Sequence, residues 1–229
     1  MAIVIGNTAA TGRDTSGSAH TANLPASIGA DNLLVVAYLT NAASRYLVTP
    51  VGWDGEQHSN AGASVGSIGF IWKETDGTEG ATEDFSYQTG TSQAASVSFL
   101  VTGHDVSDPF NSDNFTIQHE TSEDPWTVAS GLLTGVNNSD SIVAVFGGAK
   151  AVRSIVIQDA DLTLIQSVNS GYSVHALYES SPGSSNSAYS NDMSGSREWL
   201  EVLLEIKSAS AGGLSIPIAA YHYNQSLRG

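Results

Sequence analysis

A histidine and an aspartate stand side by side at His104 and Asp105, a pairing that a catalytic triad or a metal centre would need. No His-Glu-x-x-His zinc motif accompanies them, and the one Gly-x-Ser-x-Gly pattern of the chain, at residues 62–66, is not adjacent to them. Catalytic and zinc sites need several convergent ligands, so we predict that the chain is not an enzyme. The fold can still bring two histidines to a carboxylate, because six are scattered along the chain, at His20, His58, His104, His119, His175 and His222.

The loop that begins at Asp105 carries alternating oxygen-bearing side chains of the kind that bind Ca²⁺. It lacks the spacing, the central glycine and the closing glutamate of an EF-hand. A solvated loop with Asx turns explains the pattern as well. We retain Asp105, Asp108 and Asp113 as a calcium candidate and otherwise predict no metal and no cofactor.

Two of the four tryptophans, Trp53 and Trp126, lie in predicted loops. An exposed ring in a loop can stack on the flat face of a sugar, so these two are candidates for a carbohydrate site. Such rings also serve as lids on the ends of a sandwich. Trp72 and Trp199 lie in alternating segments, where burial in the core is expected.

Composition excludes several classes of partner. The chain of 229 residues has 23 acidic and 8 basic side chains, a net charge of −15. This charge repels phosphate backbones and anionic lipid surfaces, so we predict no nucleic acid and no membrane as partner. There is no cysteine, hence no disulfide framework. The first residues lack a basic region, and we expect no signal peptide.

Period-two alternation bounded by Gly, Asn, Asp and Ser indicates an all-β protein. One segment, residues 196–205, also fits a short amphipathic helix, although its β-branched and aromatic content favours a strand. The predicted strands are Leu33 to Leu39, Val65 to Trp72, Phe85 to Gln88, Val97 to Val101, Phe115 to His119, Ile142 to Phe146, Leu162 to Ile165, Tyr172 to Tyr178 and Trp199 to Ile206.

The chain contains an internal echo. Residues 31–37 match residues 140–146, and residues 68–77 match residues 174–183. The segment from Ser86 to Leu100 corresponds, with small shifts, to the segment from Ala188 to Leu204. Two such four-strand sets can face each other as the layers of one sandwich, because a four-strand sheet with one apolar face is not stable alone. Two small separate sandwiches are the alternative.

The predicted fold is therefore an antiparallel two-layer β-sandwich, jelly-roll-like, spanning residues 1–207. Its two sequence-related halves cover about 24–105 and 126–207, and residues 105–125 form the crossover between them. The segment before about Ala19 lies outside the halves and is a candidate for contacts between subunits.

A C-terminal arm, residues 208–229, follows a hinge-like run of Ser, Ala and Gly. Pro217 would interrupt a central ladder, which favours an edge or an extended segment. The arm either packs back onto its own domain or adds to a neighbouring subunit. Its predicted partner-binding residues are Leu214, Ile216, Pro217, Ile218, Tyr221 and Tyr223.

A series of anchors runs through the chain: Gly29 to Asp31 before an apolar strand, Val51-Gly52-Trp53, a strand ending in Trp72-Lys73, and Gly103-His104-Asp105 leading to Pro109. This order resembles a β-sandwich module of bacteriophage virion proteins. The similarity covers about residues 24–207 and departs from the family's Gly-Val-Asp at His104. The resemblance implies a structural role in a capsid, head fibre or tail, and no catalytic residues.

We therefore expect a non-enzymatic virion protein, a capsid decoration or accessory subunit made in the host cytoplasm. Its expected partners are other virion proteins and further copies of itself. The rival reading is a carbohydrate-binding or adhesin module, of a phage tail or a cell surface, that uses Trp53 and Trp126. A third reading is a depolymerase or another hydrolase.

Overall fold

The structure is a computed structural model that describes residues 2–15, 17–42, 45–59, 66–120, 126–128, 140–157, 160–180, 189–193 and 199–209. Its regular elements are all β-strands. In the described residues no helix is long and apolar enough to cross a membrane.

Seven strands come from the first half of the chain: β1 (Val4–Thr11), β2 (Ala19–Asn23), β3 (Ala30–Thr40), β4 (Asp54–Ser59), β5 (Ser67–Asp76), β6 (Thr82–Ser86) and β7 (Ala94–Thr102). The second half contributes β8 (Phe110–Glu120), β9 (Trp126–Val128), β10 (Ile142–Ala149), β11 (Ile155–Ile157), β12 (Leu162–Ser170), β13 (Tyr172–Ser180), β14 (Tyr189–Met193) and β15 (Trp199–Ile206).

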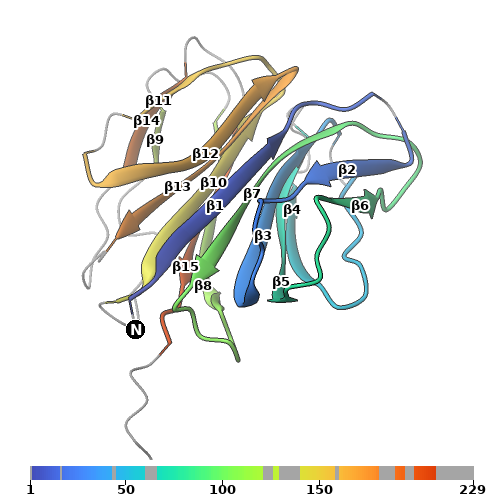
Figure 1. Cartoon of the computed structure of the whole chain (residues 1–229). Coiled ribbons are helices and arrows are strands. Elements are labelled where there is room, and N and C mark those ends of the chain that lie inside the picture. Colours follow the sequence, from blue (N-terminus) through green and yellow to red (C-terminus); the bar gives the residue numbers. More distant parts are fainter. Residues whose placement is uncertain are drawn as a thin grey trace, which may run out of the picture.

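Each half forms one large five-stranded antiparallel sheet and one small sheet. The first large sheet has the order β1-β7-β3-β5-β4, and the second has the order β8-β15-β10-β13-β12. The small sheets are β2-β6 and β9-β14-β11. In Figure 1 the two large sheets lie in the middle of the molecule and the small sheets lie outside them. The predicted antiparallel β-sandwich is confirmed, with five strands in each layer and a small sheet added over each outer face.

The internal echo corresponds to a repeated topology. Leu33 in β3 pairs with Val101 on one side and Glu74 on the other. Ile142 in β10 pairs with Ile206 and Ser180 at the equivalent points. Val101 of the first half is therefore structurally equivalent to Ile206 of the second half. The sequence alignment of the halves differs from this equivalence by one residue. The two halves therefore share strand order and nearly the same register.

The main core lies between the two large sheets. Phe70 and Phe99 of the first sheet contact Phe146 of the second, with ring centroids 5.4 and 5.9 Å apart. Alternate residues of the same strands face outward and pack against the small sheets. Leu34 and Val36 lie with Phe85 of β6 in a second cluster. A third cluster covers the outer face of the second sheet. The central strands of both large sheets are thus buried on both faces.

Two boundaries differ from the prediction. The segment before Ala19 was expected outside the halves, but β1 pairs with β7 over most of its length. Residues 105–125 were expected to form a crossover, but β8 lies within that range and pairs with β15. Only residues 103–109 connect the two large sheets. The strand at Phe115 to His119 was predicted within this range, but its pairing with β15, and that of β1 with β7, involve distant partners that local sequence does not reveal.

One edge strand of each large sheet, β1 and β12, lies beside the other. Along one seam the Arg13 amide donates to the Ser170 carbonyl at 2.7 Å, and the Gln166 side-chain amide donates to the Thr8 hydroxyl at 3.0 Å. These bonds join β1 and Arg13, which lies two residues after β1, to the edge strand β12. The seam blunts two strand edges that would otherwise be templates for association.

The place of β1 in the sheet can be tested with two neighbouring residues. Ile5 packs against the main core, whereas Val4 is 59% exposed. We expect Ile5→Asp to lower the free energy of unfolding by about 2–3 kcal/mol, because it inserts an unpaired charge beside the core. Val4→Asp is the matched control and should change it by less than about 0.5 kcal/mol. Equal effects in urea denaturation would show that β1 is not packed in this way.

Candidate functional site

The adjacent pair His104 and Asp105 does not form a joint site. The buried His104 places its Nε2 atom 2.6 Å from the Oε1 atom of Glu74. The Asp105 carboxylate instead accepts hydrogen bonds from the backbone amide and the hydroxyl of Ser107. These bonds lower the pKa of Asp105 below its ordinary value. The two side chains therefore serve separate local structures.

The three calcium candidates have different surroundings. Asp105 closes an Asx turn, as the alternative reading of this loop predicted. Asp108 forms an ion pair with Lys207. Asp113 lies on β8, and its side chain is outside the described part of the chain. In that described part, no group of three or more His, Asp or Glu side chains is placed to hold a metal ion. The calcium candidate therefore receives no support from the described carboxylates.

Trp53 is buried, with 9% of its surface exposed. Its ring meets the Phe85 ring edge-on at a centroid distance of 5.3 Å. The ammonium group of Lys73 lies 5.6 Å from the centre of the Trp53 ring. A ring enclosed in this way has no open face for a sugar, so Trp53 fits the alternative role of a lid. Trp126, predicted to lie in a loop, is instead the first residue of the strand β9, and its side chain lies outside the described part.

A tight turn directs Trp53 inward. The Trp53 amide donates to the Pro50 carbonyl at 3.1 Å, and Gly52 has a φ of +83°, which is typical of a type II turn. The turn leaves Val51 fully exposed at its tip. The loop position of Trp53 was correctly predicted, but the direction of its ring depends on this turn.

The predicted partner-binding residues of the arm all lie outside the described residues. They are Leu214, Ile216, Pro217, Ile218, Tyr221 and Tyr223. The described chain ends at Ala209.

A buried Ser-His-Asp arrangement lies in the first half, and the sequence did not indicate it. His20, on β2, places Nδ1 2.8 Å from the Oδ2 atom of Asp14 and Nε2 2.9 Å from the hydroxyl of Ser96 on β7. A carboxylate only accepts hydrogen bonds, so Nδ1 is the donor toward Asp14. Asp14 also accepts from the Tyr87 hydroxyl at 3.0 Å and from the Ala94 amide at 2.9 Å.

This arrangement is built for holding strands together. Ser96 is 1% exposed and His20 is fully buried, so a substrate cannot reach the hydroxyl. A hydrolase needs its nucleophile at a site open to the reacting atom. Burial and the neighbouring Asp14 carboxylate raise the pKa of Tyr87, which keeps its hydroxyl a donor. The network ties the small sheet β2-β6 to the large sheet through β7.

A second buried pair, His175 and Glu201, lies on the outer face of the second large sheet. The Nε2 atom of His175 is 3.3 Å from the Oε1 atom of Glu201. Gly147 lies between them on the central strand β10, paired with both. A Cβ atom at Gly147 would lie 2.4 Å from His175 Nε2. The glycine therefore allows two side chains from separate strands to meet.

Burial sets the protonation of this pair. It lowers the pKa of His175 to about 3 and raises the pKa of Glu201 well above its ordinary value. Burial therefore favours the uncharged form of both side chains, and a protonated carboxyl of Glu201 can donate to the imidazole. The echo contained a signal for this site, because it aligns His175 with Gly69 of the other half.

Comparison with known proteins gives no relative for this chain. No family model matches it, and neither the curated proteins nor the solved structures contain a match. The resemblance to virion modules therefore remains a prediction.

The role of Trp53 can be tested by truncation. We expect Trp53→Ala to lower the free energy of unfolding by about 3–5 kcal/mol, because a buried aromatic ring is lost. Val51→Ala, two residues earlier and fully exposed, is the control and should have little effect. Loss of glycan binding by Trp53→Ala without loss of stability in thermal denaturation would favour a carbohydrate site instead.

The buried carboxyl gives a pH-dependent prediction. Above about pH 4.5 the unfolded chain ionises Glu201, whereas the native state retains its proton, so native stability falls as pH rises. Glu201→Gln removes this titration and keeps a donor toward His175. The stability of the variant relative to the wild type should therefore increase with pH, by at most about 1.4 kcal/mol per unit.

Denaturant titrations between pH 5 and 8 measure this difference. Glu83→Gln, on the small outer sheet, removes one carboxylate from the surface and controls for net charge. Below pH 6.5 both wild type and Glu201→Gln should lose stability toward pH 3, because the unfolded chain protonates His175 and the native state does not. A difference between Glu201→Gln and wild type that is constant with pH would contradict a protonated Glu201.

Proposed function

We propose that this chain is a non-enzymatic structural subunit of a bacteriophage particle, a capsid decoration or accessory protein that acts through protein-protein contacts. Its partners are other virion proteins and further copies of itself. The observation that carries the proposal is the firmly held exit of the chain from the sandwich, followed by twenty residues rich in apolar side chains.

The exit is fixed by three contacts between the end of the chain and the loop that joins the halves. The Lys207 amide donates to the Pro109 carbonyl and the Ala209 amide donates to the Gly103 carbonyl, both at 2.8 Å. Between them, Ser208 forms a β-bridge with His104. A fixed starting point limits the directions in which the following residues extend, which favours specific contacts over random ones.

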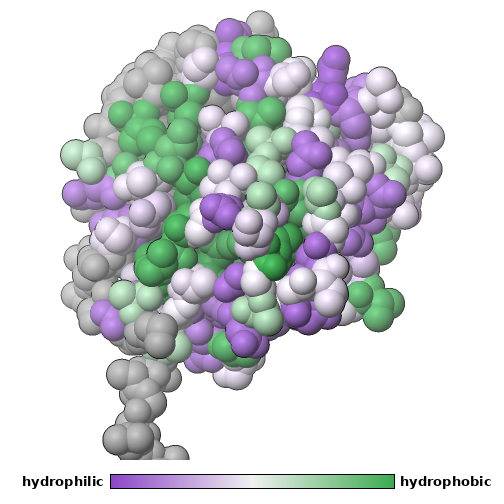
Figure 2. Space-filling view, viewed as in Figure 1, coloured by the Kyte–Doolittle hydropathy of each residue, from purple (hydrophilic) through white to green (hydrophobic). Residues whose placement is uncertain are grey.

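The surface of the sandwich supports the same role. With a net charge of −15, copies of the body repel one another unless a specific contact offsets the repulsion. On the face shown in Figure 2, hydrophobic side chains gather over β12 and the lower half of β1. Val4 of β1 and Leu164 of β12 are 59% and 41% exposed. Exposed apolar groups of this kind are typical of contact surfaces.

The arm can be tested by truncation. We expect the full-length chain to be oligomeric and a chain that ends at Ser210 to be monomeric, measured by size-exclusion chromatography with light scattering. A full-length variant with serine at Leu214, Ile216 and Ile218 is the matched control for length, and it should behave like the truncated chain. If the shortened chain assembles as well as the full chain, the arm does not make the contact.

A second measurement addresses the particle. Mass spectrometry of gradient-purified virions of the source phage should find the chain in a fixed ratio to the major capsid protein. Presence in the infected cell but absence from the particle would overturn the proposal.

A further inference from the structure

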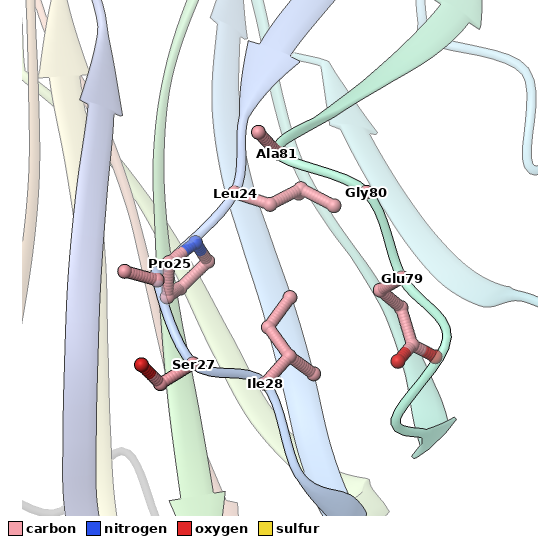
Figure 3. Close-up of a pocket in the computed structure, with 8 residues that line it drawn as sticks. Leu24, Pro25, Ser27, Ile28, Glu79, Gly80 and Ala81 are labelled. Atoms are coloured by element: carbon pink, nitrogen blue, oxygen red, sulfur yellow. The ribbon is translucent and has the colours of Figure 1, made fainter.

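A small pocket opens at one end of the first half. The link between β2 and β3 and the turn before β6 form its walls, residues 24–28 and 79–81 (Figure 3). Its volume is about 250 Å³. Small-molecule sites occupy roughly 300–1,000 Å³, so this pocket suits one or two protein side chains better than a cofactor.

The pocket offers a mainly apolar surface. Leu24 belongs to the second hydrophobic cluster, and Ile28 packs against that cluster. The one charged wall residue, Glu79, has 3% of its side chain exposed. Its carboxylate forms an ion pair with Lys73 at 2.9 Å and accepts hydrogen bonds from the amides of residues 76 and 77. An incoming aliphatic side chain therefore meets no unsatisfied charge.

Acidic side chains lie next to the pocket, and the arm carries none. Asp31 and Asp76 are exposed next to the pocket, at the paired ends of β3 and β5. All 23 acidic residues of the chain occur at or before Glu205, and the arm carries Arg228. In an extended arm Leu214, Ile216 and Ile218 would lie on one face, because side chains alternate along a strand. An uncharged aliphatic segment can therefore approach this rim without charge repulsion.

The positions of the exit and the pocket allow a second copy to supply the arm. The chain leaves between the large sheets, where the Ser208 amide donates to the Ser141 hydroxyl. The pocket lies on the outer side of the first large sheet, beside Leu24. Both lie at the same end of the sheet, because Gly103 directly follows β7 and residue 28 closely precedes β3, whose Leu33 pairs with Val101. Two copies that meet at this end can exchange arms reciprocally in a closed twofold dimer.

We propose that the pocket at residues 24–28 and 79–81 receives an aliphatic side chain from residues 214–218 of a second copy of this chain. This inference rests on the proposed function and names the surface that the arm binds.

The absence of cysteine allows a direct test by disulfide trapping. Ala81→Cys places a thiol on the exposed rim of the pocket, and Ile216→Cys places one on the arm. A mixture of the two single variants, under mild oxidation, should give a covalent dimer on non-reducing gels. The control mixture pairs Ile216→Cys with Val152→Cys, a 57% exposed position in the second half, and should give at least five-fold less dimer.

The possible results are distinguishable. An internally linked monomer from the double variant, without dimer, would show that the arm folds back on its own body and would overturn the inference. Equal trapping at Ala81 and Val152 would also overturn it, while loss of assembly in the chain ending at Ser210 would still support the proposed function. A full-length chain that is monomeric at all concentrations would contradict both the proposed function and the inference about the pocket.

Discussion

The packing of two large sheets across one shared core is the constraint on which the rest of the structure depends. Because small sheets also cover their outer faces, consecutive residues of the central strands are buried, and from Leu33 to Leu39 none is measurably exposed. This explains why the sequence shows continuous apolar runs where one-sided sheets show strict alternation. It also means that any polar side chain on these strands must find its partner inside the protein, since water does not reach it. His175 and Glu201, on β13 and β15, meet that requirement by contacting each other.

The same constraint explains a difference between the two halves at one pair of equivalent positions. Where Tyr38 pairs with Gly69 in the first half, Gly147 pairs with His175 in the second. The bulky residue has moved to the other strand, and glycine has taken its former place. A Cβ atom at Gly69 would lie 2.5 Å from the Tyr38 hydroxyl, so neither pair tolerates two large side chains. In the second half the exchange opens room above β10, and Glu201 reaches the imidazole across it. The two halves thus have different side chains at equivalent paired positions. Packing limits the total side-chain volume at such a pair but does not fix the residue types.

The sequence predicted the strands that form the main core and missed most of those that cover or flank it. Apolar, β-branched runs such as Ile142 to Phe146 indicate their own conformation. The strands β1 and β4, by contrast, are rich in polar residues and glycine, and they are strands because a neighbouring strand pairs with them. The site residues show the same division. Asp14 and Ser96 are far apart in the chain and meet only through the tertiary fold, so no local motif marks their network. The echo did hold information that was not used, because it aligns His175 with a glycine and so marks a change of packing at that row.

The buried histidines also bear on the charge of the protein surface. With His20, His104 and His175 all buried beside carboxylates, the described histidine side chains are committed to internal contacts. The acidic groups that remain outside make the body of one copy repel the body of another over roughly a Debye length, about 8 Å at physiological ionic strength. Under the proposed function, contacts between copies come from segments that carry apolar side chains without negative charge. The chain beyond Glu205 has that composition, and it leaves the body at a hydrogen-bonded anchor between the two halves. A sandwich of two similar halves that uses its buried polar groups for cohesion therefore fits the proposal that a segment outside its sheets makes contacts between copies.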